Sequence, residues 1–133
     1  MNIFFMDKDK PRIDVLISPM MFSLSLASPN YKKLLSSLGI PCIQAMTTMQ
    51  PYDEWFDSTQ GMTTMEVSYT AAQPEFDGNL ITVPFASREQ EKIDPITGAL
   101  MTRYVPIKDR LEKIVDLSLN WAKLRRKKIQ NVG

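Results

Sequence analysis

Two short apolar runs lie on either side of a helical pattern between Ile13 and Met46. The first run, IDVLISPMMF, is β-branched at its start and is typical of a buried strand that ends near Pro19. The intervening SPNYKKLLSSLG offers Ser28 as N-cap, Pro29 at the first helical position and Gly39 as the stop. The second run is IPCIQAM. A strand, a helix of about ten residues and a second strand predict a parallel βαβ unit with a right-handed crossover.

The middle of the chain carries a helix start followed by a corner. Thr63 with Glu66 three residues later forms a capping-box pattern, so we expect a helix over 64–72. Pro74 is expected to end that helix, because proline disfavours a helical conformation for the residue before it. Gly78 accepts a positive φ, so PEFDG is predicted to be a tight turn.

The remaining segments predict a third strand and a long helix. LITVPFA, residues 80–86, is an apolar run typical of a strand, and the polar SREQEKIDPITGAL after it is expected to be an exposed loop. MTRYV is interpreted as a short strand. An amphipathic helix begins at Pro106, and one face of it is apolar or small: Ile107, Leu111, Ile114, Val115, Ser118, Trp121 and Ala122.

These elements together indicate an α/β fold of three layers, with a mostly parallel sheet built on βαβ units. Residues 1–133 form a single α/β domain, or a fragment of one, on this interpretation. The first strand begins with no upstream partner, and the last helix runs into IQNVG where another strand would normally follow. We therefore expect an incomplete part of a larger chain.

The composition of the 133 residues excludes several kinds of site. The chain has no histidine and one cysteine, Cys42, which rules out the usual structural zinc site and a histidine-dependent triad. It contains neither GxxxxGK[ST] nor GxGxxG, and its formal net charge is +1. We expect no nucleotide hydrolysis by this chain alone, no nucleic acid partner, no membrane span and a cytoplasmic location. Metal chemistry would have to use oxygen ligands.

A series of motifs then follows in a specific order: DVLISPMMFSLS, LGIPCIQAM, DEWFDSTQGM, PEFDG, FASRE, DPITG, RYVP and NWAKLRRK. This order resembles the interior part of the large subunit of cobaltochelatase and magnesium chelatase. The acid–Trp pair of that family is matched by Glu54 and Trp55, in a predicted short helix that ends at Gly61, and its Pro-Glu pair by Pro74 and Glu75. RYVP and LRRK are nearer to the cobalamin branch. Many members have Gly-Gly where this chain has Ala-Ser before its first helix.

The resemblance implies one section of a subunit that binds a tetrapyrrole, either a corrin or a porphyrin. That subunit houses the site where a divalent metal, cobalt or magnesium, is inserted as substrate. ATP is implied only through separate AAA+-type partner subunits of this ligase complex, and the section alone is expected to be inactive. Two alternatives stay open: a tetrapyrrole-binding or subunit-docking module without catalytic groups, and an inactive truncated relative.

Glu75 is the first candidate catalytic and metal-binding residue. Metal insertion requires the ion to shed water and two ring N–H protons to leave, and a carboxylate assists as a hard oxygen ligand and as a general base. The expected position of Glu75 at the C-terminal side of a helix favours a cation or a proton there. The ordinary alternative is a solvated turn residue.

Five further candidates have stronger structural alternatives. Asp77 and Glu54 are candidate metal ligands, although Asp-Gly is a common turn pair. Trp55, Arg88 and Arg103 are candidate tetrapyrrole contacts, because an aromatic face packs against a macrocycle and a guanidinium forks onto carboxylates. Such a tryptophan is more often part of a core, and such arginines are more often on the surface.

Overall fold

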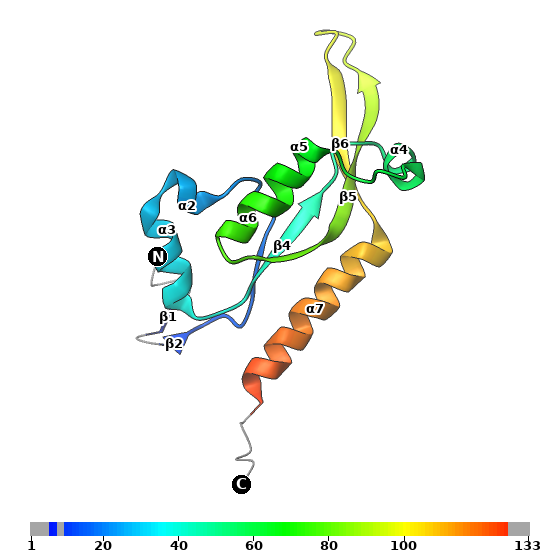
Figure 1. Cartoon of the computed structure of the whole chain (residues 1–133). Coiled ribbons are helices and arrows are strands. Elements are labelled where there is room, and N and C mark those ends of the chain that lie inside the picture. The colour runs from blue at the N-terminus through cyan, green and yellow to red at the C-terminus, as the bar shows by residue number, and fades with distance from the viewer. Residues whose placement is uncertain (1–5, 8–9, 128–133) are drawn as a thin grey trace.

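A computed structural model describes residues 6–7 and 10–127 of the chain (Figure 1). The elements in chain order are β1 (Met6–Asp7), β2 (Lys10–Pro11), β3 (Leu16–Ser18), α2 (Leu24–Ala27), α3 (Pro29–Leu38), β4 (Cys42–Thr47), α4 (Tyr52–Asp57), α5 (Thr64–Val67), the π-helical η1 (Ser68–Ala72), α6 (Gln73–Phe76), β5 (Leu80–Ile93), β6 (Leu100–Pro106) and α7 (Lys108–Arg126).

The main sheet has the order β3-β4-β5-β6. β3 pairs in parallel with β4, and β4 pairs in parallel with β5. β6 is antiparallel to β5. The predicted βαβ unit is therefore confirmed, and its helix α3 has the predicted bounds, because Gly39 takes the left-handed conformation with φ 58° that ends it. β3 is shorter than the apolar run that predicted it.

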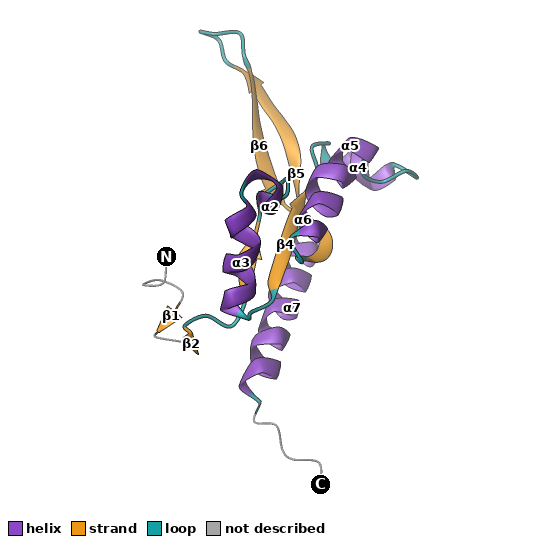
Figure 2. Ribbon diagram, turned by 60° about the vertical axis from the view of Figure 1, so that its left-hand side comes forward, coloured by secondary structure: helices purple, strands orange, loops and turns teal. Residues whose placement is uncertain are grey.

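Helices lie on both sides of this sheet (Figure 2). The core cluster is formed where Ile43 and Ala45 of β4 meet Ile114 of α7. Because side chains alternate along a strand, Gln44 of β4 faces the opposite side, where β4 contacts η1. The predicted α/β class, with a mostly parallel sheet between helical layers, is confirmed.

The helix that was expected to end at Pro74 continues to Phe76, so this prediction was wrong. The chain passes from α5 through the π-helical η1 into α6 as one continuous helix (Figure 1). In a π-helical turn, the N–H of residue 74 would bond to the carbonyl of residue 69, but proline has no N–H. The carbonyl of Tyr69 instead accepts a hydrogen bond from the Phe22 N–H at 2.9 Å. A contact from a distant segment therefore satisfies the group that proline leaves unpaired.

The polar segment after residue 86 was also predicted wrongly. β5 extends to Ile93 and pairs with β6 to form a long ribbon that projects from the sheet (Figure 1). The turn signals of Asp94-Pro95 and Thr97-Gly98 occupy only the tip of this ribbon, where Gly98 N–H bonds to Asp94 C=O at 2.8 Å. α4 ends at Asp57, four residues before the expected stop at Gly61, and the short helix α2 was not expected.

Within the described ranges, none of the helices has the length and apolarity needed to cross a bilayer.

Candidate functional site

The PEFDG corner closes the continuous helix at the amino end of β5. Asp77 N–H and Asn79 N–H both bond to the Pro74 carbonyl, at 3.0 and 3.2 Å. Gly78 has φ 81°, and its N–H bonds to the Glu75 carbonyl at 2.9 Å. Only Asp77 and Gly78 form the expected turn, because the first three residues of the motif are helical. The turn is nonetheless held rigidly by its own backbone.

Glu75 and Asp77 differ in what surrounds them. The Glu75 side chain is exposed, and the structure describes no hydrogen bond to it among residues 10–127. Asp77 accepts hydrogen bonds from the Ser23 hydroxyl at 2.6 Å, from Leu24 N–H at 2.8 Å and from Ser25 N–H at 3.1 Å, and also from the Ser25 hydroxyl. Burial tends to raise the pKa of Asp77, but these donors outweigh it and lower the pKa below its ordinary value. Asp77 therefore holds the first turn of α2, while Glu75 keeps both oxygens available for an external group.

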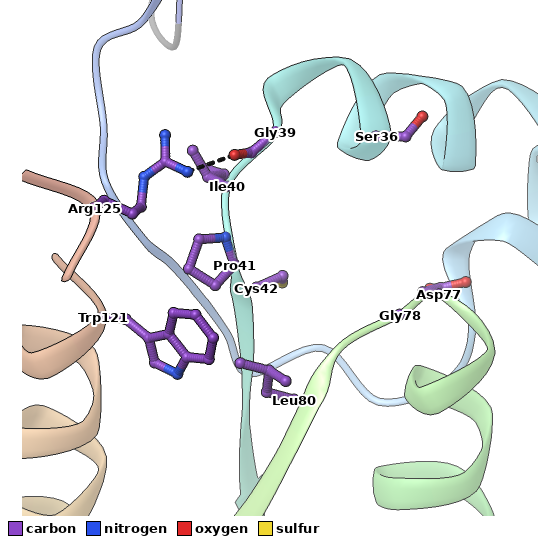
Figure 3. A pocket seen from close by; sticks show the side chains of 10 residues that line it. All are labelled: Ser36, Gly39, Ile40, Pro41, Cys42, Asp77, Gly78, Leu80, Trp121 and Arg125. Atoms are coloured by element: carbon purple, nitrogen blue, oxygen red, sulfur yellow. Dashed lines mark hydrogen bonds between the residues drawn. The ribbon is translucent and has the colours of Figure 1, made fainter. Parts of the chain in front are cut away.

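A cavity of about 500 Å³ lies beside this corner, at the amino ends of β4 and β5 (Figure 3). It is bounded by α7 on one side and by α3 and the corner on the other (Figure 3). The lining residues are Ser36, Gly39, Ile40, Pro41, Cys42, Asp77, Gly78, Leu80, Trp121 and Arg125. The volume is within the range of small-molecule sites, about 300–1,000 Å³.

The thiol of Cys42 contributes a neutral surface to this cavity. Burial raises the pKa of Cys42 to about 11, and the charge of Asp77 adds to the effect. The thiol therefore stays protonated near neutral pH and behaves as a small apolar group. Cys42 is a buried residue at the start of β4.

Glu54 and Trp55 lie at the other end of β4, in α4 (Figure 1). Glu54 is exposed, and the guanidinium of Arg110 lies 5.6 Å from the centre of the Trp55 ring. Because β4 and β5 are parallel, the segment after β4 and the segment before β5 are at opposite edges of the sheet. The structure does not bring Glu54 together with Glu75 and Asp77. Among the residues it describes, no group of three His, Cys, Asp or Glu side chains is placed to hold an ion.

Arg88 and Arg103 are on the projecting ribbon, away from the PEFDG corner. Arg88 is opposite Tyr104, and Arg103 is opposite Glu89, so the two guanidinium groups are on opposite faces of the ribbon. Both are exposed; Arg88 donates to Thr102 at 3.2 Å and Arg103 pairs with Glu91 at 2.8 Å. The structure does not bring these predicted tetrapyrrole contacts together at one surface.

Glu66 is a buried acid whose position the sequence predicts only in part. It is 3% exposed and accepts hydrogen bonds from the segment after β4 and from the start of α5. The capping-box pattern predicted the bond to Thr63, and both halves of the box are present. The bonds to Thr48, Met49 and Gln50 join segments that no local pattern connects.

Trp121 and Arg125 were not predicted to be part of a site. Trp121 was placed on the apolar face of the last helix, and Arg125 belonged to a run of helix-terminal cations. Their spacing of four residues puts both on one side of α7, and this was the sequence signal that they could contact a common partner. The sequence does not tell which element that side of α7 faces, because this depends on how α7 packs against the sheet.

Comparison with known proteins agrees with this architecture. The profile described as CobN/Magnesium Chelatase matches residues 1–131. The chain belongs to this family. A solved structure, the catalytic subunit of cobaltochelatase from Mycobacterium tuberculosis, matches with a TM-score of 0.71 and 26% identity over 86% of this chain and 10% of that one.

Two relatives show how much of the family's length this section represents. The protein MJ0908 of Methanocaldococcus jannaschii is 33% identical over 93% of this chain and 10% of its own length. The chloroplastic magnesium-chelatase subunit ChlH of Oryza sativa subsp. indica is 30% identical over 89% of this chain and 8% of its own length. The chain thus spans about a tenth of the relatives it matches, and as a family member it corresponds to one section of a chelatase large subunit.

Proposed function

We propose that this chain is a section of a large subunit that binds a tetrapyrrole and presents Glu75 to the divalent metal being inserted. The observation that carries the proposal is the match of nearly the whole fold to the catalytic subunit of cobaltochelatase. The PEFDG corner adds a local argument. Its Asp77 and Gly78 line a cavity of ligand size, whereas Glu75 is outside that lining, is exposed and has no described side-chain hydrogen bond.

The proposed chemistry of Glu75 follows from its surroundings. An exposed carboxylate in the last helical residues before a rigid turn can replace one water of the arriving ion, since hard divalent cations take oxygen ligands. The same oxygens can accept a proton that leaves a ring nitrogen. Asp77, two residues away, is occupied by the N-terminal turn of α2, so its proposed part is to hold the corner and add negative charge near the ion.

Cobalt insertion is the proposed reaction, with magnesium insertion as the alternative. The solved cobaltochelatase subunit supports cobalt, whereas the match to ChlH supports magnesium at similar identity. ATP hydrolysis is proposed to come from separate partner subunits, since the chain contains no phosphate-binding loop motif.

The test has two stages. First, a free-base porphyrin with two propionates is titrated into the purified chain, and its absorbance is followed; a saturable shift is expected. Second, Glu is changed to Gln at the position matching Glu75 in a full-length relative assayed with its partner subunits. Ring binding should persist while Co²⁺ insertion falls by about 100-fold or more, which is typical for loss of a general base. Insertion at the unchanged rate would refute the proposed role of Glu75.

A second candidate function is docking without catalysis, and one apolar surface favours it. Ile17, Ala45, Phe85, Leu111 and Val115 border a groove between β3 and α7, and three of these are markedly exposed: Ile17, Leu111 and Val115. In the described part of the chain β3 pairs only with β4, so its other edge is open. A neighbouring section of a chelatase subunit would cover both features. In that case, an aspartate at the position matching Val115 in a full-length relative would disrupt the packing of this section against its neighbour. A glutamine at the position matching Glu75 would have no effect on metal insertion.

A further inference from the structure

The cavity beside the PEFDG corner has a charged group at each end and apolar walls between them. Figure 3 shows Arg125 and the Trp121 indole at the α7 side, Asp77 at the opposite side, and Pro41 and Leu80 between the two sides. The wide aromatic surface of Trp121 is the largest flat element of this lining. Such a surface favours a flat, largely apolar ligand, because aromatic rings pack in offset or tilted stacks.

Arg125 is already oriented toward this space. One of its N–H groups donates to the Gly39 carbonyl at 2.5 Å, at the C-terminal end of α3 (Figure 3). A cation is favourable at that end of a helix. A guanidinium has five N–H donors in a planar fork, so a single bond to Gly39 holds the group while other donors can bind a carboxylate. Arg125 is exposed, and such a carboxylate can reach it from the mouth of the cavity.

Asp77 determines which end of the cavity an anion would use. Its oxygens accept from Ser23, Leu24 and Ser25, so it remains a negative charge with most of its acceptor capacity used internally. An anionic group of a ligand would be repelled from this end and attracted to Arg125 at the other. The two charges therefore predict how a bound anionic ligand is oriented, with its anionic group at the Arg125 end of the cavity.

We propose that this cavity binds one edge of a planar, largely apolar ring that carries a carboxylate, with Trp121 packing on the ring and Arg125 binding the carboxylate. The identification of that ring as a tetrapyrrole with carboxylate arms rests on the proposed function. A volume of about 500 Å³ accommodates part of a macrocycle, and the rest lies outside this section. Arg125 and Trp121 are the proposed ring contacts at this cavity, whereas the predicted contacts Arg88, Arg103 and Trp55 do not line it.

The experiment compares a free-base porphyrin that carries two propionates with its dimethyl ester, which has no charge at those positions. Binding of each to the purified chain is measured by absorbance and by quenching of tryptophan fluorescence. Arg125→Gln should weaken binding of the diacid by roughly three- to tenfold, the range for an exposed charge-assisted hydrogen bond, and leave the diester unchanged. Trp121→Phe should weaken both ligands, because it reduces the aromatic surface without removing it.

Arg126→Gln is the matched control, since Arg126 is adjacent on α7 and donates to Asp14 at 2.7 Å instead of lining the cavity. Far-UV circular dichroism and thermal unfolding of each variant establish that it is folded. If both porphyrins bind and Arg125→Gln weakens neither, the inference is overturned and the proposed ring binding stands. Equal weakening of diacid and diester by Arg125→Gln also overturns it. If neither porphyrin binds the wild-type chain, ring binding by this section is refuted, and the inference with it.

Discussion

Replacing Glu66 by Gln tests how a buried carboxylate holds two segments together. Glu66 accepts hydrogen bonds from the Thr48 hydroxyl at 2.9 Å, Met49 N–H at 2.6 Å and the Gln50 amide at 3.0 Å. It also accepts from the N–H and hydroxyl of Thr63, at 2.8 and 2.7 Å. All five donors point at one group that is 3% exposed. A neutral amide of the same shape presents a donor where some of these need an acceptor, which leaves buried donors unpaired.

The size of the effect follows from the pKa of Glu66. Burial by itself would raise this pKa, but the bonds from Met49, Thr63 and Gln50 outweigh it and lower the pKa from 4.5 to about 2. Since one pKa unit corresponds to about 1.4 kcal/mol, the ionised group adds about 3 kcal/mol to the free energy of unfolding at neutral pH. Because the pKa is lower in the folded state, this contribution is present above pH 4.5 and is lost as the pH falls from 4.5 toward 2.

Urea unfolding followed by far-UV circular dichroism measures this contribution. Near pH 7, Glu66→Gln should unfold with a free energy lower than wild type by about 2–3 kcal/mol, and the difference should shrink toward zero near pH 2. Glu112→Gln, which changes an exposed carboxylate on α7, is the control and should follow the wild type at every pH. A difference that stays constant between these pH values would show that the loss comes from packing and not from the ionised group. No difference at neutral pH would refute the reasoning altogether.

Two further outcomes follow from the PEFDG corner and the adjacent cavity. Asp77→Ala removes the acceptor of Leu24 N–H and Ser25 N–H, so the free energy of unfolding should fall by about 1–3 kcal/mol in thermal or urea unfolding; an unchanged value would mean that α2 is held by other contacts. Cys42 has a pKa raised from 9.0 to about 11 by burial and by Asp77, so at pH 8 an aromatic disulfide reagent should modify the native thiol at least about tenfold more slowly than the urea-unfolded thiol. Equal rates would contradict a buried, protonated Cys42.

The sequence predicted those parts of the fold that depend on neighbouring residues. α3 begins and ends as predicted, because Pro29 and Gly39 act on their own backbone angles. The capping box of Thr63 and Glu66 spans three residues and formed as expected. Parallel pairing of β3 and β4 followed from the helix between them, since a crossover of that length brings two strands side by side in parallel.

Local patterns were wrong where a distant segment changed the outcome. Pro74 did not end its helix, because Phe22 supplies the hydrogen bond that proline cannot make. The polar residues after 86 became a strand because β6 pairs with them along the ribbon, and cross-strand pairing stabilises a polar strand as well as an apolar one.

The candidate site likewise has features that the local sequence predicts and features that only the tertiary structure determines. The sequence by itself determined the turn at Asp77 and Gly78, where Gly78 takes a positive φ, and placed Glu75 just before it. Only the tertiary structure decided that Asp77 binds α2, more than fifty residues earlier in the chain, and that Glu54 lies at the other edge of the sheet. It also brought Trp121 and Arg125 to the start of β4. Turn and capping signals act through the backbone angles and hydrogen bonds of neighbouring residues, whereas long-range hydrogen bonds and the packing of α7 on the sheet depend on how the whole chain folds and on the summed burial of its side chains.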